Sequence, residues 1–230
     1  MLKGLWQNIG GRPAPSRYTA RQFRREFKHN LGTCKWEPHP LYSVFTQYDQ
    51  EYYLKQKEAF LHKYRCFYAV SRTISPRKII ELGTCAGSGA DAYLNAAPDA
   101  EYLGIDVFGE NIRHDNQSPW KPYEVAQQLF EARGYPNSQL LRVDLRKLDK
   151  LPSEADLVVV DAAHDFDNEY ADLKLALTAN PTFIFVDDAN DEHHARPAIN
   201  RFLEQDVKQI VNYIVSIDYP DGGLVINLRK

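Results

Sequence analysis

Cysteine is scarce in this sequence, with three residues in a chain of 230. Cys34, Cys66 and Cys85 are odd in number and show no CxxC spacing, so they suggest neither a disulfide framework nor a paired-thiol motif. Disulfide frameworks belong to oxidising compartments. We therefore expect a reduced, cytoplasmic protein.

Long apolar runs are also missing. No stretch approaches the roughly 20 consecutive apolar residues that span a bilayer, and residues 1–17 (MLKGLWQNIGGRPAPSR) lack the continuous apolar stretch of a secretory signal. There is no low-complexity tract and no repeat period. With 43% hydrophobic and 26% charged residues, the chain is typical of a globular protein that buries a substantial core, and no membrane partner is expected.

Charge is unevenly distributed. Residues 1–40 carry eight Lys or Arg against two Glu, which leaves the other 190 residues at a net charge of −9. A basic arm can contact a phosphate-bearing partner, or it can neutralise the acidic body of its own or a neighbouring subunit. The sequence gives little support for a nucleic-acid partner, and it leaves a homo-oligomer open.

The first third of the chain predicts helices. Residues 19–30 fit a short basic helix capped by Thr19. Residues 41–71 place aromatic side chains three or four apart, which predicts one or two amphipathic helices. These rings either pack on a sheet or form a lid over an acceptor pocket. We divide the chain into a helical extension, 1–72, which serves as a lid or in oligomerisation, and a cofactor-binding domain, 73–230.

From Lys78 onward, apolar runs alternate with helical patterns. Strands are expected at 78–84, 101–107, 138–144, 155–161, 182–188, 211–218 and 223–229, and helices at 88–97, 121–134, 167–179 and 196–206. This alternation predicts an α/β fold with a doubly wound, mostly parallel, seven-stranded Rossmann-like sheet. The YPDG link at 219–222 fits a hairpin, so the last strand should run antiparallel.

The run KIIELGTCAGSG at 78–89 contains the end of the first strand and a glycine-rich turn with Gly83, Gly87 and Gly89. It has neither the GK[ST] of a phosphate-binding P-loop nor the GxGxxG spacing of an NAD site. Glu81 before the turn would repel a pyrophosphate and suits a cationic ligand such as a sulfonium. Asp106, at the end of the second strand, is placed to accept hydrogen bonds from a ribose.

IIELGTCAGSG followed by LGID resembles motifs I and II of the class I S-adenosylmethionine-dependent methyltransferases. The resemblance implies the methyltransferase form of the Rossmann-like sheet and S-adenosyl-L-methionine as cofactor. Cys85 stands where many members carry glycine. By position, the implied cofactor-binding residues are Glu81, Gly83, Cys85, Gly87 and Asp106, with Asp144 where the family often contacts adenine.

Acidic residues also end the next strands. Asp161 ends the fourth strand, and Asp187 and Asp188 end the fifth. Neighbouring parallel strands bring these carboxylates to one edge of the sheet, where they repel one another unless a cation shares them. Oxygen ligands suit Mg²⁺ or Ca²⁺. The alternative is a solvated strand end.

The pattern D-x-x-H-x-[YF]…D-L…DD resembles the metal-dependent O-methyltransferases, including catechol-type enzymes and the CmcI and macrocin-type branch, over about residues 78–206. The resemblance implies Asp161, Asp187 and Asp188 as metal ligands. His164 is placed to take the acceptor's proton, so Asp161 and His164 are the predicted catalytic residues. His164 could instead cap the following helix.

The expected function is therefore methyl transfer from S-adenosylmethionine to an oxygen of a hydroxylated small molecule such as a sugar diol or a catechol, with a divalent metal. Two alternatives stay open. A nucleic-acid N-methyltransferase usually carries [DNS]PP[YFW] after strand four, where this chain has DAAH. The second alternative is a catalytically silent binding module with the same fold. Such a module would need the glycine turn but not the acids at the strand ends.

Overall fold

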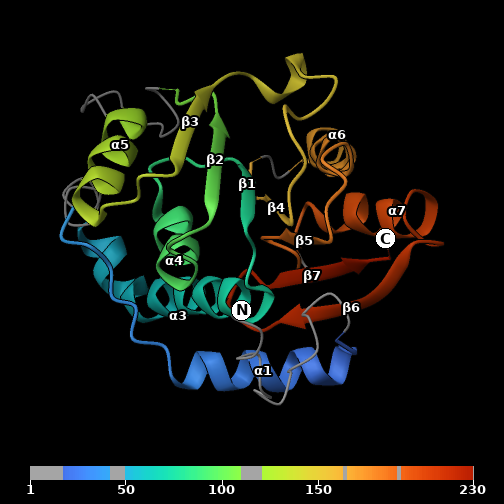
Figure 1. Cartoon of the computed structure of the whole chain (residues 1–230), viewed down its shortest axis with the longest axis horizontal. Helices are drawn as coiled ribbons and strands as arrows, with labels where there is room; N and C mark the ends of the chain where they lie inside the picture. The colour runs from blue at the N-terminus through green and yellow to red at the C-terminus, as the bar shows by residue number, and fades with distance from the viewer. Residues whose placement is uncertain (1–17, 42–49, 110–120, 163–164, 191–192, 230) are drawn as a thin grey trace, which may run out of the picture.

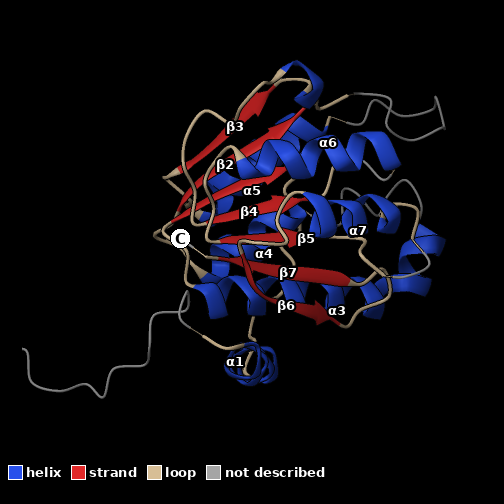
Figure 2. Ribbon diagram, turned by 90° about the vertical axis from the view of Figure 1, so that its right-hand side faces the viewer, coloured by secondary structure: helices blue, strands red, loops and turns tan. Residues whose placement is uncertain are grey.

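The structure is a computed structural model that describes residues 18–41, 50–109, 121–162, 165–190 and 193–229. Within these ranges one seven-stranded sheet has helices on both faces (Figures 1 and 2). The strand order is β3-β2-β1-β4-β5-β7-β6. The strands are β1 (Lys78–Leu82), β2 (Glu101–Asp106), β3 (Ser138–Arg142), β4 (Leu157–Val160), β5 (Phe183–Val186), β6 (Val211–Ile217) and β7 (Gly223–Leu228).

The sheet confirms the predicted architecture. Strands β1 to β5 pair in parallel, whereas β7 runs antiparallel to both of its neighbours, β5 and β6. Every residue of β4 and β5 is buried, as expected where helices cover both faces of a parallel sheet. All seven strands lie within the ranges that the apolar runs predicted.

The helices form two layers. Helices α3 (Gln50–Ile74), α4 (Ser88–Ala96) and α5 (Pro122–Arg133) lie on one face of the sheet, and α6 (Phe166–Leu177) and α7 (Arg196–Gln205) lie on the other (Figure 2). Helix α1 (Ala20–Gly32) packs on α3 beside β6, and a short 3-10 helix, η2 (Leu145–Lys147), follows β3. None of the described helices is long and apolar enough to cross a membrane.

The N-terminal helices belong to the same core as the sheet. Phe23 of α1 lies 6.3 Å from the ring of Phe183 in β5, and Phe67 of α3 stacks on Tyr93 of α4 at 5.2 Å between centroids. The boundary proposed at residue 72 therefore falls inside α3 and within a continuous core. A role of residues 1–72 as a lid or in oligomerisation stays a prediction. Of the aromatic segment 41–71, positions 42–49 lie outside the described residues.

Asp91 of α4 is a buried acid that joins three parts of the chain. Its side chain is fully buried and accepts hydrogen bonds from Arg133 Nε (2.8 Å), Tyr135 Oη (2.9 Å) and Trp36 Nε1 (3.0 Å). Arg133 ends α5, and Trp36 lies in the segment after α1. A buried charge is tolerated when it is paired and hydrogen-bonded. The hydrogen bonds of Asp91 therefore also hold α4 in place beside α5 and the segment after α1.

We expect Asp91→Ala to lower the free energy of unfolding by about 3–5 kcal/mol, because it leaves the Arg133 guanidinium and two further donors without their shared acceptor. Urea unfolding measures the change. Asp99→Ala, at an exposed position near the end of the same helix, is the control and should change stability by less than about 0.5 kcal/mol. A loss in Asp91→Ala as small as that expected for Asp99→Ala would show that the cluster contributes nothing to stability.

Candidate active site

The ends of four neighbouring strands lie side by side at the carboxyl edge of the sheet. Backbone hydrogen bonds continue past the strands, with Gly83 N donating to Ile105 O (2.9 Å), Asp161 N to Leu82 O (2.9 Å) and Asp187 N to Val160 O (3.0 Å). The register therefore brings the glycine turn beside Asp106, Asp161 and Asp187. Ligands of open α/β sheets bind at this edge.

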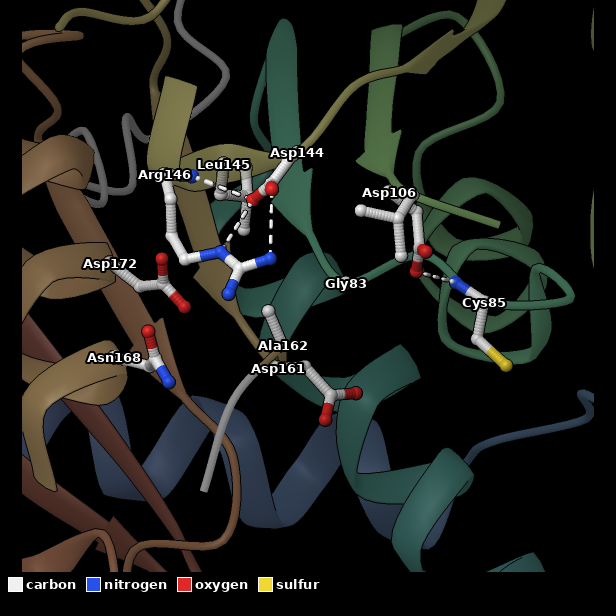
Figure 3. A pocket seen from close by; sticks show the side chains of 11 residues that line it. Gly83, Cys85, Asp106, Asp144, Leu145, Arg146, Asp161, Ala162, Asn168 and Asp172 are labelled. Carbon is white, nitrogen blue, oxygen red and sulfur yellow. Dashed lines mark hydrogen bonds and ion pairs between the residues drawn. The ribbon is translucent and has the colours of Figure 1, made fainter. Parts of the chain in front are cut away.

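A cavity of about 410 Å³ opens beyond these strand ends (Figure 3). Its volume is in the range of small-molecule and cofactor sites, about 300–1,000 Å³. Five of the residues that the sequence singled out line it together. Among the residues that the structure describes, those that line the cavity are Gly83, Cys85, Asp106, Val107, Asp144, Leu145, Arg146, Asp161, Ala162, Asn168 and Asp172.

The turn packs directly against the loop after β4. Gly83 has φ +91°, and a Cβ atom there would overlap the carbonyl oxygen of Asp161 and lie 2.5 Å from Cα of Ala162. Cys85 also has a positive φ, +50°, a conformation that glycine adopts more easily. Glycine would meet this backbone requirement of position 85 with less strain. The turn and the Asp161 loop thus form one rigid wall of the cavity.

Asp106 holds the turn against the second strand. Its Oδ2 accepts a hydrogen bond from the backbone N–H of Cys85 (2.8 Å), and its Oδ1 accepts one from Phe108 (2.6 Å). The side chain is mostly buried, and Figure 3 shows the carboxylate beside Cys85. Each carboxylate oxygen has a second lone pair, so Asp106 retains acceptor capacity for hydroxyl groups of a ligand.

Glu81, in β1, and Gly87, within the turn, are not among the residues that line the cavity. Burial raises the pKa of Glu81 to about 8, while a hydrogen bond from the Tyr102 hydroxyl lowers it. The carboxyl group is therefore mainly protonated at pH 7 and supports the turn from beneath. A Cβ at Gly89 would lie 2.6 Å from Glu81 Oε1, and one at Gly87 would lie 3.2 Å from the Phe130 ring.

The far wall of the cavity carries an ion pair. Asp144 caps η2, and both of its oxygens accept hydrogen bonds from Arg146, with Nε and Nη2 each 2.8 Å away. The hydrogen bonds from Arg146 hold the pKa of Asp144 below its ordinary value. On α6, burial and the nearby Asp165 together raise the pKa of Asp172 to about 7.

Sequence reasoning missed Arg146, Asn168 and Asp172. Two signals were present: Arg146 follows the strand-end acid Asp144 by two positions, and Asn168 and Asp172 are four apart, which places them on one face of a helix that begins just after Asp161.

The predicted acid cluster is present. One oxygen from each of Asp161, Asp187 and Asp188 lies within 4.8 Å of the other two. The Asp187 side chain is fully buried, and its Oδ1 accepts a hydrogen bond from the Tyr219 hydroxyl (2.6 Å). Asp188 has a positive φ of +51°, and His193 Nε2 lies 3.7 Å from its Oδ2. His164 lies outside the described residues.

A lysine from the N-terminal extension enters this cluster. Lys63 of α3 places its Nζ 2.5 Å from Oδ2 of Asp187 and 3.6 Å from Oδ1 of Asp188. Burial raises the pKa of Asp161, as does the nearby Asp187, whereas Lys63 opposes this shift. Sequence reasoning missed Lys63, because a lysine on an amphipathic helix is ordinarily solvated and its acidic partners are far away in the chain.

The fold is that of known methyltransferases. The chain is similar to the S-adenosylhomocysteine-bound methyltransferase PaMTH1 of Podospora anserina over 93% of this chain and 97% of that one (TM-score 0.59, 18% identity). The O-methyltransferase TomG of Streptomyces achromogenes, involved in tomaymycin synthesis and solved with S-adenosylmethionine, matches over 91% and 99% (TM-score 0.56, 18% identity). A Geobacter sulfurreducens methyltransferase matches over 89% and 97% (TM-score 0.56, 14% identity).

No family model and no curated protein sequence matches the chain, so this likeness is one of structure. It confirms the fold that the glycine turn and the β–α alternation predicted. The chain has the fold of the class I S-adenosylmethionine-dependent methyltransferases, with structural neighbours that bind S-adenosylmethionine or its product.

Gly83→Ala should abolish measurable binding of S-adenosylmethionine, because the added methyl group overlaps the Asp161 carbonyl and pushes the turn away from the cavity. Isothermal titration calorimetry measures the affinity. Gly134→Ala is the matched control: Gly134 also has a positive φ, +69°, but its Cβ would meet open space. The control should lose about 1–2 kcal/mol of stability and bind the cofactor as the wild type does.

Proposed function

We propose that the chain is an S-adenosylmethionine-dependent O-methyltransferase that acts on a hydroxylated small molecule with the help of a divalent metal ion. One observation carries the proposal: Asp161 lines the cavity beside the glycine turn and also belongs to the acid cluster. A donor site and a candidate cation site thus share one residue, which supports metal-assisted methyl transfer.

The cavity has the features that the cofactor needs. Asp106 would accept hydrogen bonds from the ribose hydroxyls, with its orientation fixed by two backbone amides. Gly83 and Cys85 would contact the methionine part through the backbone of the turn, and Asp144 would contact the adenine. Glu81 and Gly87 would affect cofactor binding indirectly, because they help to maintain the shape of the turn. S-adenosylmethionine supplies an electrophilic methyl group on a sulfonium, and it leaves as S-adenosylhomocysteine.

The acid cluster fits a hard divalent cation. Its ligands are all carboxylate oxygens, they lie close together, and Asp187 and Asp188 are buried. Such a donor set suits Mg²⁺ or Ca²⁺, and Asp161, Asp187 and Asp188 would hold the ion. When bound, the ion would supply Lewis-acid chemistry, which would lower the pKa of an acceptor hydroxyl.

The chain's own residues would orient and deprotonate the acceptor. The turn and the Asp161 loop are in contact, so the methyl donor and the acceptor oxygen would be held by one rigid wall, which favours an in-line approach. As the new carbon–oxygen bond forms, the carbon–sulfur bond breaks and the hydroxyl proton must leave. We assign that proton to His164, which follows Asp161 by three positions.

Calorimetry with S-adenosylmethionine, with and without EDTA, followed by methyl-transfer assays on catechols and sugar diols, tests the proposal. Cofactor binding with metal-dependent transfer supports it. Cofactor binding with transfer only to nucleic-acid bases would favour the N-methyltransferase alternative, and binding without transfer to any acceptor would favour the silent module. Absence of cofactor binding would contradict both enzymatic functions.

Asp106→Ala should weaken S-adenosylhomocysteine binding about tenfold or more, because ribose hydroxyls lose a buried acceptor. Since the change also removes the acceptor of two backbone amides, thermal unfolding is measured beside calorimetry. Asp149→Ala, at an exposed position beyond β3, serves as the control. An unchanged affinity in a folded Asp106→Ala protein would rule out a ribose at this end of β2.

Asp188→Asn should reduce metal-dependent turnover about 10–100-fold while cofactor affinity changes little, because the variant loses a ligand charge but leaves the glycine turn intact. Steady-state rates are compared over a range of metal concentrations. Turnover that persists in the presence of a chelator would remove the metal from the mechanism.

A further inference from the structure

The acid cluster already holds one cation, the ammonium group of Lys63. We propose that Lys63 is a built-in counter-ion that competes with the divalent ion for Asp187, and so sets the metal affinity of the site and couples metal binding to the position of α3. This inference rests on the metal site of the proposed function and concerns how that site is controlled.

Lys63 forms a largely buried ion pair with the cluster rather than an ion pair at the protein surface. Its side chain is 14% exposed, and its Nζ lies within 4.0 Å of three carboxylates, those of Asp187, Asp188 and Asp221. A surface pair would be solvated and of little consequence. Here the ammonium contacts both members of the Asp187–Asp188 pair at the end of β5.

Aromatic rings hold the ammonium in place. Nζ of Lys63 lies 5.6 Å from the ring centroid of Phe67 and 6.0 Å from that of Tyr219, distances at which a cation is attracted to a ring face. Tyr219 also donates its hydroxyl proton to Oδ1 of Asp187. The same tyrosine therefore orients the carboxylate and covers the lysine that contacts it.

Competition follows from the two oxygens of Asp187. Oδ1 already accepts the hydrogen bond from Tyr219, and Oδ2 lies 2.5 Å from Nζ of Lys63. A metal ion bonded to Oδ2 would stand close to the ammonium, and two cations at that separation repel each other strongly in a buried site. Metal binding should therefore displace Lys63 from Asp187 or be weakened by it.

The balance of charge explains why a lysine is tolerated there. The cluster brings the carboxylates of Asp161, Asp187 and Asp188 together, so a positive charge beside them is favoured whether it comes from Lys63 or from a divalent ion. Without the metal, Lys63 limits the repulsion within the cluster. With the metal, its charge lowers the affinity, which keeps binding reversible.

The experiment compares Lys63→Met with wild type in titrations of Ca²⁺ and Mg²⁺ by calorimetry, with neither cofactor nor acceptor present. Met has a similar length and no charge. We expect Lys63→Met to bind the ions at least about tenfold more tightly, and to be less stable than wild type when the metal is removed. Lys63→Arg retains the charge and should bind metal within about threefold of wild type.

Lys57→Met is the matched control, since Lys57 is an exposed lysine on the same helix. It should leave metal affinity and stability unchanged. An unchanged or weaker metal affinity in Lys63→Met would overturn the proposal and leave Lys63 as a structural ion pair. A gain of the same size in Lys57→Met would also overturn it, because any lost positive charge would then suffice.

Hydrogen–deuterium exchange of the wild-type protein provides a second test that needs no variant to fold. Ca²⁺ should increase exchange in the part of α3 around Lys63 while it protects the residues after β5. Protection of both segments would contradict displacement of Lys63. A protein that transfers methyl groups but binds no ion, in either wild type or Lys63→Met, would overturn this inference and leave a metal-free methyltransferase.

Discussion

Repulsion between carboxylates at one edge of a parallel sheet is the constraint on which the site depends. Parallel strands in register must end side by side, and β2, β1, β4 and β5 end in or next to acids. Unpaired charges in partly buried positions cost several kcal/mol each. Several acids near this edge have a compensating group, and the kind of compensation differs from one acid to the next.

Two acids are compensated by groups that stay in place. Asp106 accepts two backbone N–H hydrogen bonds, which fix its orientation. Glu81 is compensated differently, since burial raises its pKa to about 8 and favours the neutral form. These acids shape the donor site without depending on any added cation. Fixed compensation suits residues whose geometry has to be ready before a ligand arrives.

Other acids are compensated by side-chain cations on flexible stems. Arg146 pairs with Asp144 at the far wall of the cavity, and Lys63 pairs with Asp187 in the acid cluster. Such cations can move when a ligand offers a better partner to the carboxylate. In the cavity, Asp106 is thus held by backbone hydrogen bonds, whereas Asp144 at the far wall is held by a side-chain ion pair.

The sequence predicted the strands well because each combines an apolar run with a turn signal, and the Pro-Asp-Gly link indicated the antiparallel β7. It also singled out Gly83, Asp106 and Asp161, which the register brings to one cavity. It assigned Glu81 to cofactor binding, whereas Glu81 is buried and is not among the residues that line the cavity. Nor could it find Lys63, because the pairing of a lysine with a remote acid leaves no periodic signal and depends on how α3 packs across the sheet.

Lys63 also changes how the N-terminal extension should be viewed. A boundary at residue 72 is natural by sequence pattern, since the β–α alternation begins at Lys78. Yet α3 crosses that boundary, Phe67 stacks on Tyr93 of α4, and Lys63 reaches the acids at the end of β5. Packing and electrostatics thus join the extension to both halves of the proposed site. The extension thus supplies a positive charge to the acids at the end of β5, so the site is incomplete without α3.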